Sequence, residues 1–216
     1  MLPEISTATL LGACLGIFYL VNLFNLLRNH RRKALPTQTK PQPANPEPPM
    51  TFSLMLAAFG TFVFWFGSIF YVIFVFTGIL PLLDNILRPL RFEFDSYVQI
   101  LGIIVTTLGY FIFTWSVIAR GRYVTAWDMP ENHKLVTWGP YRCVRHPSYL
   151  SYFIMFIGLF LIWLTWIALI PLVAVPGYLR IVNKEEKILI QRFCDEYTNY
   201  QKTVGRFIPK RKTTEE

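Results

Sequence analysis

The stretch that decides the fold is Pro147–Leu179, which reads PSYLSYFIMFIGLFLIWLTWIALIPLVAVPGYL and carries no charged residue. As one helix its 33 residues would reach roughly 50 Å, well beyond the ~30 Å hydrocarbon core of a bilayer. Arg145 precedes the stretch and Arg180 follows it, so both ends are expected on the same side of a membrane. We therefore predict a helical hairpin that bends near Leu164–Ile167, with two arms of about 16 residues, short for a full crossing.

Three further stretches without charged residues precede the hairpin: Ile5–Leu27, Pro48–Leu83 and Ser96–Ala119. The chain is 53% hydrophobic and 16% charged, whereas soluble domains carry about 25% charged residues. This composition excludes a disordered chain, a disulfide scaffold and an ordinary soluble enzyme. Each of the three stretches predicts one membrane crossing, the middle one with irregular ends because of its prolines and Gly78.

The basic residues predict the orientation of these helices. Of the 21 Lys and Arg residues, 19 fall in the segments Arg28–Lys40, Arg120–Arg145 and Arg180–Lys212, and only two in the connection Leu80–Asp95. By the positive-inside tendency the three basic segments are cytoplasmic. The same distribution argues against a nucleic-acid partner, despite the net charge of +8. We predict an all-α, multi-pass integral membrane protein with about five transmembrane helices and the N-terminus outside or lumenal.

Two regions are expected along the chain. Residues 1–119 form an N-terminal three-helix membrane region with a proline-rich cytoplasmic linker at 36–49, and its first helix is a retained anchor. Residues 120–216 contain a polar loop, the hairpin 147–179 and a C-terminal segment. In Glu185–Val204 apolar residues recur at spacings of three and four, which predicts a cytoplasmic amphipathic helix.

Polar residues suited to chemistry gather at the two feet of the hairpin, in Asn132–Tyr149 (NHKLVTWGPYRCVRHPSY) and Arg180–Glu186 (RIVNKEE). The hairpin brings Tyr149 and Glu185 together although they are far apart in sequence. Imidazole and aromatic rings suit a nucleobase, carboxylates suit a cationic or hydroxylated ligand, and arginine suits a carboxylate. S-adenosylmethionine offers all of these groups. No metal is predicted, because Cys143 and His146 lack further ligands at suitable spacing.

Each element also has a purely structural explanation. Arg-His-Pro before an apolar helix is typical of an interfacial anchor with Pro147 at the first helical position. Glu185 and Glu186 favour the beginning of an amphipathic helix, and Arg145 can attract anionic lipid heads. Only the combination of these elements favours a binding site over packing.

The segment His133–Tyr149, followed by Lys184–Pro209 (KEEKILIQRFCDEYTNYQKTVGRFIP), resembles the isoprenylcysteine carboxyl methyltransferase (ICMT) family within the membrane phospholipid methyltransferase-like superfamily. The resemblance implies an integral-membrane, S-adenosylmethionine-dependent methyltransferase whose catalytic face and C-terminus are cytoplasmic. It implies cofactor contacts at ten positions: His133, Lys134, Leu135, Val136, Tyr141, His146, Pro147, Ser148, Tyr149 and Glu185.

The family also places a substrate-contacting arginine four residues before the position of Glu185, and this chain has Ile181 there, with Arg180 one residue earlier. Either a local bulge presents Arg180 in its place, or the substrate contact of this chain differs from that of the family. We predict Arg180 or Arg145 as the group that holds an acceptor carboxylate. Glu186, with His146, is the candidate base if the acceptor is an amine. A lipid-borne acceptor would enter sideways between the helices of the aromatic-rich second and fourth apolar stretches.

The favoured function is methyl esterification of a prenylated cysteine carboxylate or a similar lipid-like acceptor, in contact with membrane lipids. Two other methyl transfers stay open, to a phospholipid amine or to a small thiol. A reductase of the sterol type that uses NADPH is a further alternative, as is a membrane scaffold or lipid sensor without enzymatic activity.

Overall fold

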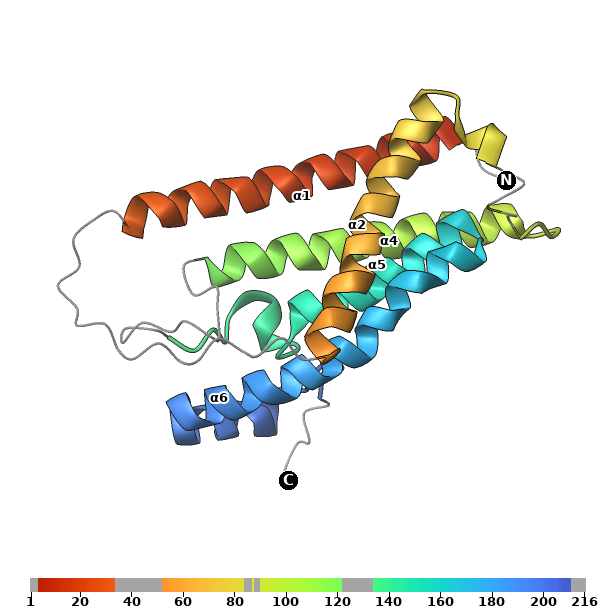
Figure 1. Cartoon of the computed structure of the whole chain (residues 1–216). Coiled ribbons are helices and arrows are strands. Elements are labelled where there is room, and N and C mark those ends of the chain that lie inside the picture. The colour runs from red at the N-terminus through yellow and green to blue at the C-terminus, as the bar shows by residue number, and fades with distance from the viewer. Residues whose placement is uncertain (1–3, 34–51, 84–86, 88–89, 122–133, 211–216) are drawn as a thin grey trace.

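The computed structural model describes residues 4–33, 52–83, 87, 90–121 and 134–210 (Figure 1). Apart from one isolated β-bridge, the regular structure of these residues is helical. The α-helices are α1 (Glu4–Lys33), α2 (Phe52–Phe76), α4 (Asp95–Arg120), α5 (Pro147–Trp163) and α6 (Ala174–Thr203). Three short 3₁₀ helices join them: η1 (Leu80–Leu83), η2 (Gly139–Arg142) and η3 (Trp166–Val173).

The helices α1, α2 and α4 coincide with the three apolar stretches before the hairpin. Four helical runs in the described residues are long and apolar enough to cross a membrane, and α5 is a shorter apolar helix. Many large apolar side chains on their outer faces are exposed, for example Phe62 and Ile104, as expected of lipid-facing surfaces. The prediction of an all-α, multi-pass membrane protein with about five helices is confirmed, whereas its orientation stays a prediction. The linker 36–49 lies outside the described residues.

The predicted hairpin is present, and its bend lies at the predicted position. Leu164 adopts the left-handed conformation (φ 49°, ψ 43°) and Thr165 is extended, which reverses the chain after α5. The Leu164 N–H donates to the carbonyl of Phe160 at 2.8 Å and closes the helix. Pro171 lies in the next turn, and its missing N–H is compatible with the 3₁₀ geometry of η3.

The second arm of the hairpin is longer than predicted. We expected the arm to finish at Leu179 and a separate helix to begin at Glu185, but α6 runs without a break through both. At Cys194 (φ 44°, ψ −117°) the backbone is not helical, and this kink divides α6 into two helical parts. The residues after Leu179 are mostly good helix formers, so the helix continues after its apolar part has ended. The second arm of the hairpin therefore passes directly into the segment that carries Glu185 and Glu186.

Small residues let the helices approach closely at two interfaces. Where α4 meets α5, a Cβ at Gly102 would lie 2.8 Å from the backbone of Leu161, and one at Gly158 would collide with Thr106. Where α2 meets α6, a Cβ at Gly60 would lie 2.8 Å from Ala174. Such contacts are typical of membrane helices, which associate through close backbone packing. These close contacts pack α5 against α4 and α6 against α2, so the hairpin lies between α2 and α4 (Figure 1).

Candidate functional site

The 3₁₀ turn η2 attaches the polar loop before α5 to the helix bundle. Residues 134–137 have no regular structure, and η2 follows with Gly139 at φ +61°, where a Cβ would lie 3.0 Å from Ala119. The Trp138 indole N–H donates to the carbonyl of Ala119 at 2.9 Å. Tyr141 is buried, and its carbonyl accepts a hydrogen bond from the Tyr200 hydroxyl on α6 at 2.5 Å. The loop is thus fixed to both α4 and α6.

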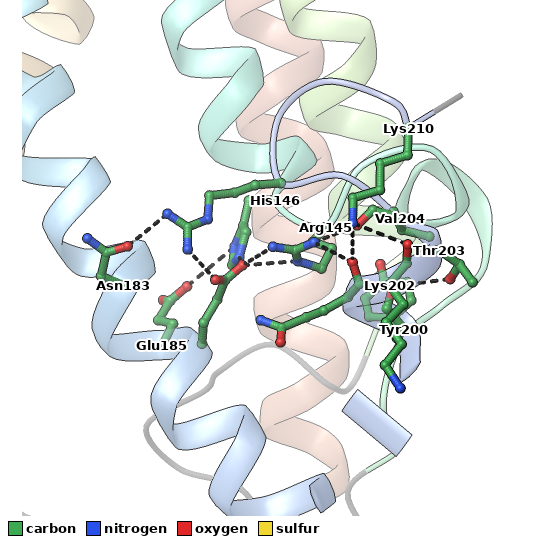
Figure 2. Close-up of polar contacts among 12 residues, drawn as sticks. Arg145, His146, Asn183, Glu185, Tyr200, Lys202, Thr203, Val204 and Lys210 are labelled. Carbon is green, nitrogen blue, oxygen red and sulfur yellow. Dashed lines mark hydrogen bonds and ion pairs between the residues drawn. The ribbon is translucent and has the colours of Figure 1, made fainter. Parts of the chain in front are cut away.

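The chain after α6 returns to the foot of α5 and pairs with it. Val144 and Gly205 form the β-bridge, and the Arg145 N–H donates to the Gly205 carbonyl at 2.9 Å. The His146 N–H donates to the Arg206 carbonyl at 3.1 Å. Figure 2 shows Arg145 and His146 between the helix that carries Asn183 and Glu185 and the C-terminal segment with Val204 and Lys210. We call residues 204–207 the C-terminal strap.

Glu186 is the centre of a buried ionic cluster. Its Oε1 accepts from Nε and Nη2 of Arg145 at 3.0 and 2.8 Å and lies 3.1 Å from Nε2 of His146, while Oε2 accepts from Arg206. Only 6% of the Glu186 side chain and 8% of the Arg145 side chain are exposed. Arg145 also donates to the carbonyl of Val204 in the strap. The cluster therefore joins the loop, α6 and the strap.

The charge-free part of the second arm ends at Leu179, so the residues of the Glu186 cluster lie beyond the membrane-spanning part. Burial raises the pKa of Glu186, but hydrogen bonds from His146, Arg206 and Arg145 outweigh burial and lower the pKa to about 2. A carboxylate with so low a pKa stays ionised and accepts a proton poorly.

Glu185, the next residue, is buried in a different environment. Its Oε1 accepts a hydrogen bond from the Tyr149 hydroxyl at 2.6 Å, and its Oε2 lies 3.8 Å from Nδ1 of His146. The side chain is 13% exposed, and among the described residues it forms no ion pair with a lysine or arginine. Burial raises the pKa of Glu185, although the Tyr149 hydrogen bond opposes the rise. A bound cation would supply the positive charge that no lysine or arginine of the described residues provides at ion-pair distance from Glu185.

Tyr149 connects this site to an apolar cavity of about 520 Å³ between α2 and α6. Ligand sites commonly have volumes of about 300–1,000 Å³. The Tyr149 ring lies 5.0 Å from that of Tyr178, whose hydroxyl is 2.6 Å from Thr61 Oγ1 on α2. The cavity lining is mainly apolar and aromatic: Tyr19, Leu54, Ala57, Ala58, Thr61, Phe62, Trp65, Phe66, Tyr149, Tyr178, Ile181 and Lys184.

The structure brings several of the predicted cofactor residues together. His146 and Pro147 are buried at the foot of α5, and the Ser148 and Ser116 hydroxyl oxygens are 2.8 Å apart. Lys134 is exposed, and Leu135 and Val136 are half-buried. His133 lies outside the described residues. The predicted proximity of Tyr149 and Glu185 is confirmed, while the cofactor contacts stay predictions.

Arg180 does not occupy the position that a bulge would give it. The helix is regular at 180 and 181, so Ile181 lines the cavity, while the exposed Arg180 donates to Ser53 Oγ at 3.3 Å. The expected bulge is wrong, because the only non-helical residue of α6 is Cys194. The catalytic role of Arg180 stays a prediction, as do those of Arg145 and Glu186.

Sequence reasoning missed four residues that shape the site. Arg206 pairs with Glu186, and the Phe207 ring lies 6.1 Å from the His146 ring. Both residues lie near the end of Lys184–Pro209, one of the two segments that carry the family resemblance, but no pattern in the sequence indicated their partners. Lys184 lines the cavity beside the two glutamates, and Thr61 on α2 had no signal in the sequence.

The family model of phospholipid methyltransferases matches residues 97–196, just under half of the chain. This match confirms the predicted resemblance to the membrane phospholipid methyltransferase-like superfamily over these residues, and it supports a membrane methyltransferase. A solved structure titled as the eukaryotic intramembrane Ras methyltransferase ICMT is similar at 21% identity, with a TM-score of 0.47. The match covers 76% of this chain and 54% of that one, so this chain spans about half the length of that protein. No curated protein matches.

Proposed function

We propose that this membrane protein is an S-adenosylmethionine-dependent methyltransferase that methylates the carboxylate of a lipid-borne acceptor, a prenylated cysteine being the leading candidate. The observation that carries the proposal is the environment of Glu185. This buried carboxylate lacks a lysine or arginine ion-pair partner among the described residues, whereas Glu186 has two arginines. Burying an unpaired charge is costly, so such a site favours a cationic ligand.

The residues around Glu185 fit S-adenosylmethionine. The Glu185 carboxylate suits the sulfonium or the α-ammonium group, and the His146 and Tyr149 rings, 6.0 Å apart, suit the purine. The irregular backbone at 134–137 offers N–H and C=O groups to polar edges of the ligand. When bound, this cofactor would supply a methyl group on positively charged sulfur, for transfer to the acceptor oxygen with loss of a neutral thioether.

The protein contributes position and exclusion of water. Glu185 holds the cation, and Tyr149 fixes the Glu185 carboxylate while also lining the acceptor cavity. A carboxylate acceptor is ionised at neutral pH and needs no general base. Arg145 and Glu186 then act as positioning residues, because their buried pairing joins the loop, α6 and the strap.

N-methylation of a phospholipid amine is the second candidate, and the description of the matching family model favours it. An amine must lose a proton before it attacks carbon, which requires a base. The pKa of Glu186, about 2, makes Glu186 a poor base and leaves His146. We rank this candidate second for that reason.

Labelled S-adenosylmethionine and a panel of acceptors separate the candidates. The full-length protein, reconstituted in lipid nanodiscs, is offered a prenylcysteine, an aminophospholipid and an amphiphilic thiol. We expect a base-labile methyl ester on the prenylcysteine. A base-stable N-methyl product would establish the second candidate, a thioether product would establish the thiol, and no transfer together with no cofactor binding would overturn the proposal.

A further inference from the structure

The apolar cavity between α2 and α6 has a charged end. On α2 its lining residues run from Leu54 to Phe66, about 18 Å along the helix at 1.5 Å per residue. On α6 they are Tyr178, Ile181 and Lys184, which follow one another at intervals of three residues and so share one face. Among the described residues that line the cavity, Lys184 alone is charged.

The direction of the helices places Lys184 at one end of the cavity. Gly60 of α2 packs on Ala174, whereas a Cβ at Gly177 would lie 2.8 Å from the amide nitrogen of Ala57, so α2 and α6 run antiparallel. Lys184 follows Gly177 by two turns of helix and therefore lies toward the beginning of α2, with Leu54. The opposite end carries aromatic residues of α2.

Lys184 and Glu185 face different partners although they are neighbours. Successive helix residues project about 100° apart, so Lys184 faces the cavity while Glu185 faces Tyr149 and His146. Tyr149 lies between these two environments, because it lines the cavity and donates to Glu185. An anionic group bound by Lys184 would thus lie on the cavity side of Tyr149, next to the position where Glu185 would bind a cation.

From this placement we propose that Lys184 is a specificity-determining residue that binds the anionic head of the acceptor while the acceptor's hydrocarbon chain occupies the α2–α6 cavity. The inference rests on the proposed function and deepens it. Within the described part of the chain Lys184 has no ion-pair partner, so its ammonium group is available to a ligand. Ile181 cannot provide such a contact, and Arg180 binds Ser53 outside the cavity lining.

Binding of two probes with one tail tests the role of Lys184. N-acetyl-S-farnesylcysteine carries a carboxylate, and its carboxamide carries the same farnesyl chain without the charge. Affinities are measured for the full-length protein in phosphatidylcholine nanodiscs. K184M should weaken binding of the carboxylate about fivefold or more, as expected for one lost charge-assisted contact, and leave binding of the carboxamide unchanged. K184R should retain most of the affinity.

Two further variants serve as matched comparisons. K187M removes an exposed lysine one turn further along α6, outside the cavity lining, and should alter neither affinity. A58W fills the cavity and should weaken both probes equally. Lysophosphatidate is also tested as a competitor of the carboxylate probe. If it competes only when Lys184 is present, Lys184 binds a phosphate head as well, and its proposed role as the site for an anionic head stands.

Three results would overturn the inference. If K184M loses equal affinity for both probes, Lys184 contributes packing or an interfacial contact and does not bind the anionic head. A charge-selective loss in R180M, with K184M unaffected, would assign the head to Arg180. Wild-type affinity of A58W for both probes would mean that their farnesyl chain does not occupy the α2–α6 cavity. If the wild-type protein binds neither probe but binds S-adenosylmethionine, the lipid acceptor of the proposed function fails, which is a different outcome.

Discussion

At the scale of single residues, the adjacent glutamates of α6 illustrate how environment decides a role. Glu186 forms ion pairs with Arg145 and Arg206 and stays ionised, whereas the largely buried Glu185 has a tyrosine hydroxyl, a more distant imidazole and the charge of Arg120 near it. The two carboxylates have pKa values shifted in opposite directions, and shifted pKa values cluster at functional sites.

Replacing Glu185 by Gln should weaken S-adenosylmethionine binding about 10- to 100-fold, because a hydrogen bond or contact to a charged group contributes roughly 1.5–3 kcal/mol. Titration calorimetry in detergent measures the dissociation constant. E196Q, an exposed position on the same helix, is the control and should bind like the wild type. An unchanged dissociation constant for E185Q would remove Glu185 from the cofactor site.

The affinity for the cofactor should also depend on pH. The pKa of Glu185 is raised in the free protein, so its carboxylate becomes ionised only as the pH rises through that raised value. A cationic ligand binds the ionised form, and affinity should therefore increase as the pH rises through the raised pKa of Glu185 and level off once ionisation is complete. The same titration of E185Q should be flat over this range, and a rising curve there would assign the effect to another group.

Replacing Arg145 by Met should destabilise the protein strongly. The change leaves Glu186 with a single arginine and removes the donor to the Val204 carbonyl, and breaking a buried pair costs about 3–5 kcal/mol. Thermal unfolding in detergent measures the loss. R142M removes an exposed arginine of the same loop and should unfold like the wild type. Equal unfolding temperatures for both variants would mean that the cluster does not hold the loop.

At the scale of elements, the fold depends on the close contact between α4 and α5. Gly158 contributes to this contact because its missing side chain leaves room for Thr106. Replacing Gly158 by Leu should push the helices apart and cost roughly 1–3 kcal/mol or more. Gly16 of α1 has open space around it, so G16L is the matched control. Wild-type thermal stability of G158L would contradict the packing described here.

The elements also show what could be predicted from the sequence. Basic residues at both ends of Pro147–Leu179 indicated that the chain reverses its direction within this stretch. The bend lies at Leu164, near the centre of the stretch, so that the two arms are of similar length. The continuation of α6 past Leu179 was not predictable from polarity, because leaving an apolar layer does not end a helix.

Side-chain partners were beyond prediction for a related reason. The pairing of Arg145 with Glu186 depends on where the strap lies against the loop before α5, and no periodicity encodes that position. The cavity likewise depends on Ala57, Ala58 and Thr61 facing α6, which requires the helix rotation to be known. The proximity of Tyr149 and Glu185, by contrast, followed from the hairpin alone.

At the scale of the whole molecule, the candidate site exists only because the two feet of one hairpin lie at the same end of the helix bundle. The loop before α5, the residues after Leu179 and the strap all meet there. α2 lines most of the cavity, so under the proposed function the N-terminal helices would contribute the acceptor side and the hairpin the cofactor side.

Thiol accessibility tests this arrangement most directly, because exposed Cys143 lies before α5 and exposed Cys194 lies in α6. With Cys14 replaced by Ser, variants that retain one of these thiols are labelled with an impermeant maleimide in vesicles of known orientation. A third variant, without the native thiols, carries W166C at the bend. We predict that Cys143 and Cys194 react from the cytoplasmic side alone and that the thiol introduced by W166C does not react from that side. Labelling of Cys143 and Cys194 from opposite sides would contradict the account.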